Sequence, residues 1–237
     1  MSASIPPINP LHDLRLLVYL FLSLRVLLLV SYPPQLLPPG QGAVAVETGL
    51  TRLGDFREHY TLATQTNADF LPYRDYWVEF PPVWPVLVHG LYALTQARTG
   101  DFTSWASLLY LILLAVDLGN LLWVRHLGGV LHGPGVGAAL AWVYALLAAP
   151  WVMLAWNFEA LVLFCLLAGW AWARQGRASL AGGVLALGIL AKYVPLLALP
   201  LLWRYRPRRV AAVVTGVALG GPGWCCWGWW PGVANWP

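Results

Sequence analysis

Long apolar runs alternate with short polar stretches along the chain, and their lengths predict helices that cross a membrane. The first run, at 14–32, holds about 19 residues, which suffices for one crossing. Further runs predict spans at about 103–124, 135–152 and 158–173, a broken helix pair at 180–203 and a last span at 210–221.

The run at 180–203 differs from the others because it contains one charge and two prolines, at Lys192, Pro195 and Pro200. Proline lacks a backbone donor and interrupts the hydrogen bonds of a helix. Broken helices are tolerated in membranes where they line a polar cavity. The pattern therefore predicts two half-helices around a break near Pro195.

A polar stretch at 33–80 separates the first span from a shorter apolar segment at 81–98. Four apolar residues of the polar stretch share one face at helical spacing: Leu53, Phe56, Tyr60 and Ala63. This spacing predicts an amphipathic helix at the membrane surface. The segment at 81–98 has only about 13 apolar residues in a row, a length that favours an interfacial helix or hairpin over a crossing.

The basic residues select one orientation. If the N-terminus is cytoplasmic and 81–98 does not cross, the loop at 33–80 is extracytoplasmic and the later basic residues face the cytoplasm, as the positive-inside rule requires. These residues are Arg125, Arg174, Arg177, Arg204, Arg206, Arg208 and Arg209. A crossing at 81–98 would place the first three of them outside. We therefore predict a multi-pass cell-membrane protein in this orientation.

The composition agrees with a membrane protein. Apolar and aromatic residues make up 59 % of the 237 residues and charged residues only 10 %, whereas a soluble domain carries about 25 % charged residues. These values exclude a soluble globular enzyme and a disordered chain. The net charge of +4 is accounted for by topology, so we expect membrane lipids and no nucleic acid as partners. The prediction is one all-α polytopic transmembrane domain over 1–237.

Candidate chemistry begins in the outer loop, which holds six of the ten acidic residues. Long loops on rigid scaffolds often carry function. Several short motifs follow one another through the loop and the spans: Leu24-Arg25, Asp55, Pro72-Tyr73, the run Arg-Asp-Tyr-Trp-Val-Glu-Phe-Pro-Pro at 74–82, Asp117-Leu118, Asn157-Phe158-Glu159 and Ala191-Lys192-Tyr193-Val194-Pro195.

In this order and spacing, the motifs resemble those of the GT-C superfamily of membrane glycosyltransferases. They are most similar to the polyprenyl-phosphate-mannose-dependent mannosyltransferases, both the bacterial phosphatidylinositol-mannoside enzymes and the first mannosyltransferase of GPI synthesis. The resemblance extends from about residue 14 to 209. It implies a GT-C-like N-terminal transmembrane module whose long first outer loop carries juxtamembrane helices.

The resemblance also implies a reaction. A sugar, mannose by analogy, moves from a polyprenyl-phosphate donor to a lipid or glycan acceptor on the outer face of the membrane. One carboxylate serves as general base for the acceptor hydroxyl, and cationic groups meet the departing phosphate. Because the donor arrives in the bilayer, no nucleotide-binding fold is needed, and the sequence has no Walker or Rossmann glycine pattern. The resemblance implies no cofactor.

Three residues carry the predicted chemistry, each with a structural alternative. Asp55, at the start of the loop helix, is the predicted base; the alternative is a carboxylate that only offsets the helix dipole. Lys192, the only lysine, is predicted to bind phosphate from within an apolar run; the alternative is a lysine that reaches to the outer interface. Arg74 is predicted to hold phosphate oxygens in bidentate fashion; the alternative is an ion pair with Asp75 or Glu79.

Further candidates for substrate binding lie nearby in the predicted topology: Tyr73, Glu79, Asn157, Glu159 and His59. The alternative for Asn157 is a helix cap. His59 follows Asp55 by one turn and is predicted to orient the base or to contact the phosphate; the alternative is an ordinary surface histidine. Arg25 and Asp117 both lie inside spans and are predicted to neutralise each other.

The sequence departs from the family pattern at three points. Leu53 replaces the first acid of the Asp-x-Asp found in many relatives, which argues against a divalent metal site, and Glu159 stands where Asp is common. The chain is shorter than family members, so we expect a member truncated at its C-terminus. Two other classes stay open: a non-catalytic membrane scaffold or accessory subunit, which the length favours, and a small transporter, which a broken helix with a lysine suits.

Overall fold

A computed structural model describes residues 10–37, 46–51, 53–67, 72–97, 100–198 and 200. The predicted span at 210–221 and the end of the predicted broken pair, at 199 and 201–203, lie outside these residues. Within the described part the chain is mostly helical. Its elements are η1 (Pro10–His12), α1 (Leu14–Ser31), β1 (Gln35–Leu37), β2 (Val46–Thr48), α2 (Asp55–Asn67), α3 (Val83–Gln96), α4 (Phe102–His132), α5 (Pro134–Leu146), α6 (Ala148–Leu154), α7 (Glu159–Arg174), α8 (Ala178–Ala191) and η2 (Val194–Ala198).

Two helices of the described part, α1 and α4, are long and apolar enough to cross a membrane. Helices α5 and α6 are together long and apolar enough to cross as well, but they are bent by 53° at their junction. Counted as one span, the pair makes a third crossing. Helix α8 is apolar but has only 14 residues. Apolar helices of this kind indicate association with a membrane, and the larger number of crossings stays a prediction.

The helix boundaries differ from the predicted ones at two points. Helix α4 does not end near residue 124 but continues to His132, where Gly133 with a φ of 95° stops it and Pro134 begins α5. The span predicted at 135–152 is interrupted at Leu147, which is extended. Pro150 explains this break, because it has no N–H for the Leu146 carbonyl and its ring would collide with that group in a continuous helix.

The stretch at 33–80 contains an element that an all-helical prediction does not include. Strands β1 and β2 pair antiparallel, with Gln35 opposite Thr48 and Leu37 opposite Val46. The all-α prediction is therefore wrong for this short hairpin, although right for the rest of the described chain. Three-residue strands are too short for a period-2 pattern to reveal them in the sequence.

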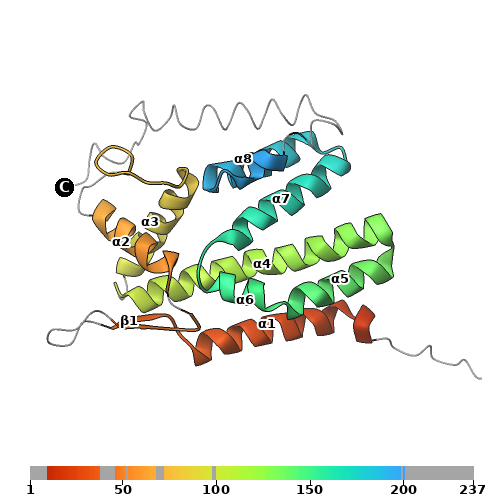
Figure 1. The fold of residues 1–237 in the computed structure, drawn as a ribbon, viewed down its shortest axis with the longest axis horizontal. Coiled ribbons are helices and arrows are strands. Elements are labelled where there is room, and N and C mark those ends of the chain that lie inside the picture. Colours follow the sequence, from red (N-terminus) through yellow and green to blue (C-terminus); the bar gives the residue numbers. More distant parts are fainter. Residues whose placement is uncertain are drawn as a thin grey trace, which may run out of the picture.

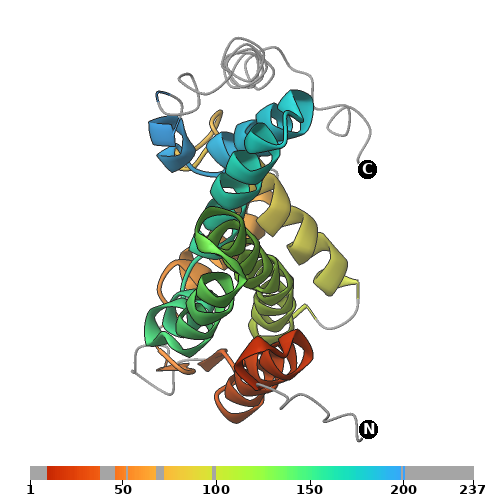
Figure 2. The same cartoon turned by 90° about the vertical axis from the view of Figure 1, so that its right-hand side faces the viewer.

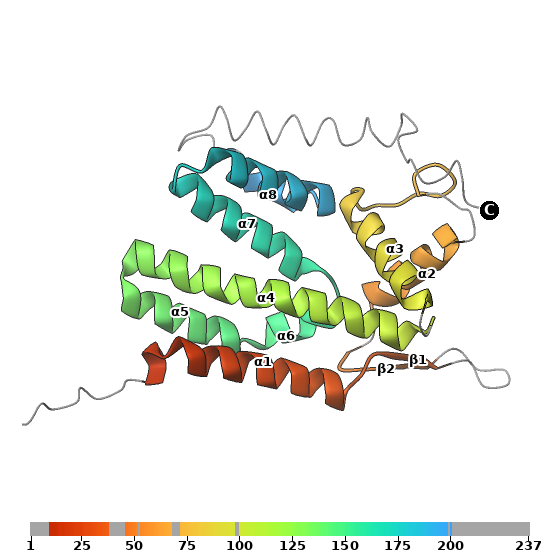
Figure 3. The same cartoon turned by 180° about the vertical axis from the view of Figure 1, so that it is seen from behind.

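Helix α4 lies at the centre of the molecule (Figures 1 and 3). Helix α5 returns along one side of α4, α7 crosses its other side, α1 packs beside α4 and α5, and α8 packs on α7. Helices α2 and α3 pack against each other at one end of α4, and Figure 2 shows the layered order from α1 to α8. Helices α2 and α3 are thus attached to one end of a helical bundle.

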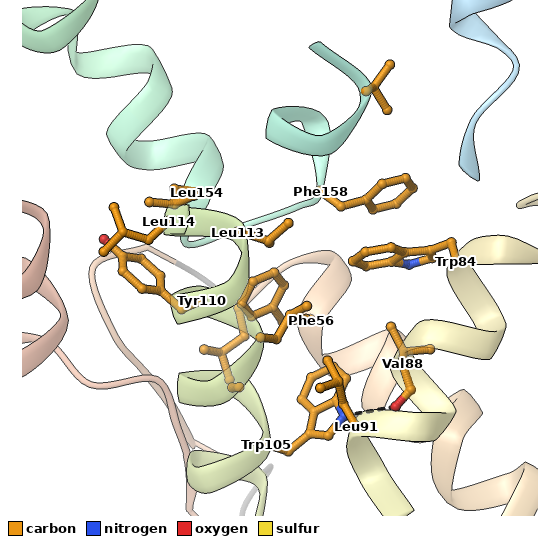
Figure 4. Close-up of a cluster of buried hydrophobic side chains, with 14 of the residues drawn as sticks. Phe56, Trp84, Val88, Leu91, Trp105, Tyr110, Leu113, Leu114, Leu154 and Phe158 are labelled. Atoms are coloured by element: carbon orange, nitrogen blue, oxygen red, sulfur yellow. Dashed lines mark hydrogen bonds between the residues drawn. The ribbon is translucent and has the colours of Figure 1, made fainter. Parts of the chain in front are cut away.

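The largest hydrophobic core joins α2 and α3 to the bundle (Figure 4). Trp105 of α4 donates a hydrogen bond from its indole to the Val88 carbonyl of α3 at 3.1 Å. The predicted apolar face of α2 is confirmed, since Leu53, Phe56 and Ala63 are buried. This face packs against protein instead of lying on lipid, because α3 and α4 cover it.

An ion pair lies in the interior of the bundle, as predicted. The Arg25 guanidinium of α1 donates to the Asp117 carboxylate of α4 at 3.0 Å, and both side chains are fully or almost fully buried. Tyr144 of α5 also donates to Asp117, and the Tyr110 hydroxyl donates to the Arg25 carbonyl at 3.1 Å. The network joins three helices at a fixed register.

The two ends of the bundle differ in charge. At one end, Arg125 donates to the His12 carbonyl at 3.1 Å, close to the start of α1. The turn between α7 and α8, with Arg174 and Arg177, lies at this same end (Figure 1). The β-hairpin, α2, α3 and the C-terminal end of α8 lie at the opposite end. The fold therefore separates these arginines from the acidic outer loop.

Candidate functional site

The acidic end of the bundle brings together three segments that are far apart in the sequence. The Lys192 ammonium, just after α8, donates to the Glu159 carboxylate at the start of α7. The charges of Lys192 and Glu159 both act on Asp55, the first residue of α2, as do those of Glu58 and Glu79. We call these five residues the Asp55 cluster. Its members are Asp55 and the four charged side chains that influence its pKa.

Helix ends position the two halves of the ion pair. The Asn157 side-chain oxygen accepts the Glu159 backbone N–H at 3.1 Å, so Asn157 satisfies one N–H of the first turn of α7, although the N-cap position itself is Phe158. Glu159 then sits in the first turn of α7, where the helix dipole favours a negative charge. Helix α8 ends at Ala191, and Lys192 has an extended backbone three residues before Pro195. The predicted break of the apolar run thus lies at Lys192.

Asp55 is partly buried at the start of α2, beside Gly54. Burial and the neighbouring Glu58 raise the pKa of Asp55 above its ordinary value, while Lys192 acts in the opposite direction. A general base is most effective when its pKa approaches the working pH, because it is then both ionised and basic. The environment of Asp55 changes its pKa in that direction.

This pKa shift predicts a pH dependence. If Asp55 acts as a base it must be ionised, so kcat/KM falls as the pH drops through its pKa, which is raised above the ordinary aspartate value. Among the neighbouring glutamates, Glu58 has the largest effect on the pKa of Asp55, and Glu58→Gln removes its negative charge. The acid limb of the profile then moves to lower pH, and Glu79→Gln moves it in the same direction by less. An unmoved limb, or a limb moved to higher pH, would contradict this assignment of the limb to Asp55.

His59 is not a surface residue, so that alternative is wrong. Its side chain is only 1 % exposed, and its ring lies 5.1–5.8 Å from the rings of Phe80, Trp84 and Phe158. Burial, with a smaller contribution from Lys192, lowers the pKa of His59 to about 3, so the ring is neutral. Among the described residues neither ring nitrogen has a hydrogen-bond partner. The ring therefore packs α2 against α3 and the start of α7, and protein encloses it.

Phe158 is the centre of this aromatic packing. It stacks on Trp84 with ring centroids 3.8 Å apart (Figure 4). The Lys192 ammonium lies 5.4 Å from the centroid of the Phe158 ring, within reach of a cation–π interaction. The Lys192 ammonium thus contacts both the ring of Phe158 and the carboxylate of the next residue, Glu159. The sequence reasoning did not identify this role, because an aromatic residue between Asn157 and Glu159 has no distinctive signal.

The loop at 72–80 carries three more predicted residues. Tyr73 has a positive φ of 67°, and its hydroxyl donates to the Phe80 carbonyl at 2.5 Å. Arg74 forms a salt bridge with Asp75 at 2.5 Å, and its side chain is 62 % exposed. The structural alternative for Arg74 is therefore the observed one. Glu79 is exposed and belongs to the Asp55 cluster through its charge.

No protein-family model, curated protein or solved structure matches this chain. The functional argument therefore rests on the residues themselves. Across the described part of the chain, no group of three His, Cys, Asp or Glu side chains is arranged to hold a metal ion. What the Asp55 cluster offers is a carboxylate of raised pKa close to a lysine that already holds an anionic partner.

Proposed function

We propose that this chain is a membrane glycosyltransferase of the GT-C type, which transfers a sugar from a polyprenyl-phosphate donor to a lipid or glycan acceptor. One observation carries the proposal: the Asp55 carboxylate, with a raised pKa, and the Lys192 ammonium belong to one cluster at the end of an apolar helical bundle. A base and a cation are the two groups that transfer from a lipid phosphate requires.

In the proposed reaction, Asp55 accepts the proton of the acceptor hydroxyl as that oxygen bonds to the anomeric carbon. The bond between the anomeric carbon and the phosphate oxygen breaks, and the polyprenyl phosphate leaves with the electron pair. The negative charge that develops on the phosphate is stabilised by the Lys192 ammonium. The products are the glycosylated acceptor, the polyprenyl phosphate and a proton, which Asp55 later releases.

Glu159 competes with the phosphate in this scheme, because its carboxylate accepts the hydrogen bond of the Lys192 ammonium. The phosphodiester of the donor carries one negative charge, as a carboxylate does, and a second develops as the polyprenyl phosphate leaves; the phosphate therefore replaces Glu159 at the ammonium group and is held most strongly in the transition state. The Arg74 side chain, held by Asp75 in an exposed loop, is then a second cation within the outer loop. Mannose as the sugar follows from the family resemblance.

The proposed orientation places the Asp55 cluster on the outer face of the membrane. Arg125, Arg174 and Arg177 lie at the opposite end of the bundle, together with the start of α1. The positive-inside rule assigns that end to the cytoplasm. A multi-pass arrangement with an extracytoplasmic first loop follows.

The ion pair predicts opposite effects of its two members on donor binding. Lys192→Met removes the cation, and we expect the KM for the lipid donor to rise by about 10- to 100-fold, as for a lost charged hydrogen bond of about 1.5–3 kcal/mol. Glu159→Gln removes the competing anion, and the same KM falls. Steady-state kinetics at varied donor concentration test both. A Glu159→Gln variant with a raised donor KM would contradict the competition between Glu159 and phosphate.

The function itself is tested with membranes that contain the full chain. They are incubated with radiolabelled polyprenyl-phosphate-mannose, other polyprenyl-phosphate sugars and a nucleotide sugar, and lipid and glycan products are extracted. We expect labelled product from a polyprenyl-phosphate sugar and none from the nucleotide sugar. A folded chain that transfers no lipid-linked sugar would contradict the proposal and favour the scaffold or accessory subunit. Movement of labelled lipid across the membrane without transfer would favour the transporter.

A further inference from the structure

Trp156 lies against the residue that precedes Asp55. A Cβ atom on Gly54 would be 1.5 Å from the Trp156 indole nitrogen and 1.7 Å from its Cδ1. The edge of the indole therefore occupies the space that a side chain at position 54 would take. Gly54 also has a positive φ of 49°, so glycine is required here for both its backbone conformation and its lack of a side chain. Two segments about 100 residues apart are thus in contact.

The backbone of the same tryptophan is held at the end of α6, just before the residues that lead to Glu159. Its backbone N–H donates to the Met153 carbonyl at 3.2 Å, at the end of α6. The next two residues, Asn157 and Phe158, are buried, and Glu159 then pairs with Lys192. Trp156 therefore contacts Gly54, the residue before Asp55, and directly precedes Asn157, Phe158 and Glu159 in the sequence.

Trp156 remains exposed in these surroundings. Its exposed fraction is 38 %, whereas Asn157 is 9 % and Phe158 is 1 % exposed. The core has room for other large aromatic rings, because Trp84 and Trp105 are completely buried. An indole that is fixed by Gly54 and still open to solvent beside charged groups is prepared to contact a ligand at little cost in side-chain entropy.

The chemistry around Trp156 matches one class of ligand. A pyranose ring has C–H groups on its faces, which pack on an indole through dispersion and apolar burial. Its hydroxyls form hydrogen bonds at its edges, and carboxylates accept such bonds well. The Trp156 indole contacts Gly54, which directly precedes Asp55, and Glu159 follows Trp156 by three residues, so these two segments carry both an aromatic ring and carboxylates.

We propose that Trp156 is the platform on which a pyranose ring of the substrate stacks, with its hydroxyls directed toward the Asp55 cluster. This inference rests on the proposed transferase function and names a sugar-binding residue that the family resemblance does not assign. The competing role is an anchor at the membrane interface, where tryptophan is frequent.

The first test measures sugar binding without turnover. The full chain, labelled with 5-fluorotryptophan and placed in lipid nanodiscs, gives fluorine resonances for its 15 tryptophans. The Trp156 signal is the one that Trp156→Phe removes. We expect mannose 1-phosphate to shift this signal, whereas glycerol 1-phosphate, which has hydroxyls and a phosphate but no ring, leaves it in place. An unshifted signal, or equal shifts with both compounds, would overturn the stacking role in favour of an interfacial anchor.

The second test measures transfer. We expect Trp156→Leu to raise the KM for the lipid-linked sugar about tenfold, and Trp156→Phe, which keeps an aromatic face, to raise it less than about threefold. Trp77→Leu is the control, since Trp77 is 87 % exposed on the outer loop. Unchanged fluorine signals of the other tryptophans show that the variants are folded. If the wild type transfers sugar and Trp156→Leu has an unchanged KM, the stacking role alone is contradicted. If the wild type transfers no sugar, the proposed function itself is contradicted.

Discussion

Replacing Asp55 with asparagine is expected to lower kcat for sugar transfer by about 10²- to 10⁴-fold, the usual contribution of a general base. Asparagine keeps the size of the side chain and its place at the start of α2, but it cannot accept the proton of the acceptor hydroxyl. The KM for the lipid donor should change little, because the phosphate is bound by Lys192. Initial rates of transfer from the radiolabelled lipid donor, at saturating donor, measure the effect.

Glu58→Gln is the matched control for Asp55→Asn. Glu58 lies one turn later on α2 and is exposed. At a pH well above the acid limb, where Asp55 is fully ionised with or without the Glu58 charge, its loss should change kcat less than about twofold. Transfer that persists at the wild-type rate in Asp55→Asn would show that another group takes the proton. An equal loss in both variants would point to a folding effect of charge at the start of α2.

The second large effect is expected inside the bundle. Asp117→Ala removes the partner of Arg25, whose guanidinium is completely buried. Breaking a buried ion pair from one side lowers the free energy of unfolding by about 3–5 kcal/mol, because the remaining charge is left without compensation. The bond that Tyr144 donates to Asp117 is lost as well. Denaturant or thermal unfolding of the purified chain in one detergent gives the difference.

Two further variants separate this charge effect from general damage. Asp75→Ala breaks the exposed pair with Arg74 and should cost less than about 1 kcal/mol. The double replacement Arg25→Met with Asp117→Leu removes both charges and should regain most of the stability lost in Asp117→Ala, because no buried charge remains. A double variant that is as unstable as Asp117→Ala would mean that packing around Asp117, and not its charge, holds α1 and α4 together.

Part of the candidate site was accessible from the sequence. One lysine in an apolar run with prolines is unusual in a chain with few charges, so Lys192 stands out by its type and place, whereas the family resemblance selects Asp55 among the six acids of the loop. The pairing of Lys192 with Glu159, by contrast, was not predicted. It depends on how the end of α8 meets the start of α7, and 33 residues separate the two side chains.

His59 and Trp156 illustrate the same limit. Helical spacing places His59 one turn after Asp55, yet it does not reveal that Phe80, Trp84 and Phe158 enclose the ring. Trp156 was one of 15 tryptophans in the sequence and had no distinguishing mark. Only its contact with Gly54 sets it apart, and this contact joins α2 to the segment between α6 and α7.

The sequence by itself determined the properties that depend on neighbours along the chain. Long apolar runs and the scarcity of charged residues indicated apolar helices and an association with a membrane. The prolines near Lys192 indicated the break after α8. The tertiary structure decided which side chains meet, because the contacts of α2 with Phe158 and of Lys192 with Glu159 depend on packing angles and helix ends that no local pattern encodes. Burial follows from the same packing, and burial is what raises the pKa of Asp55 and encloses His59.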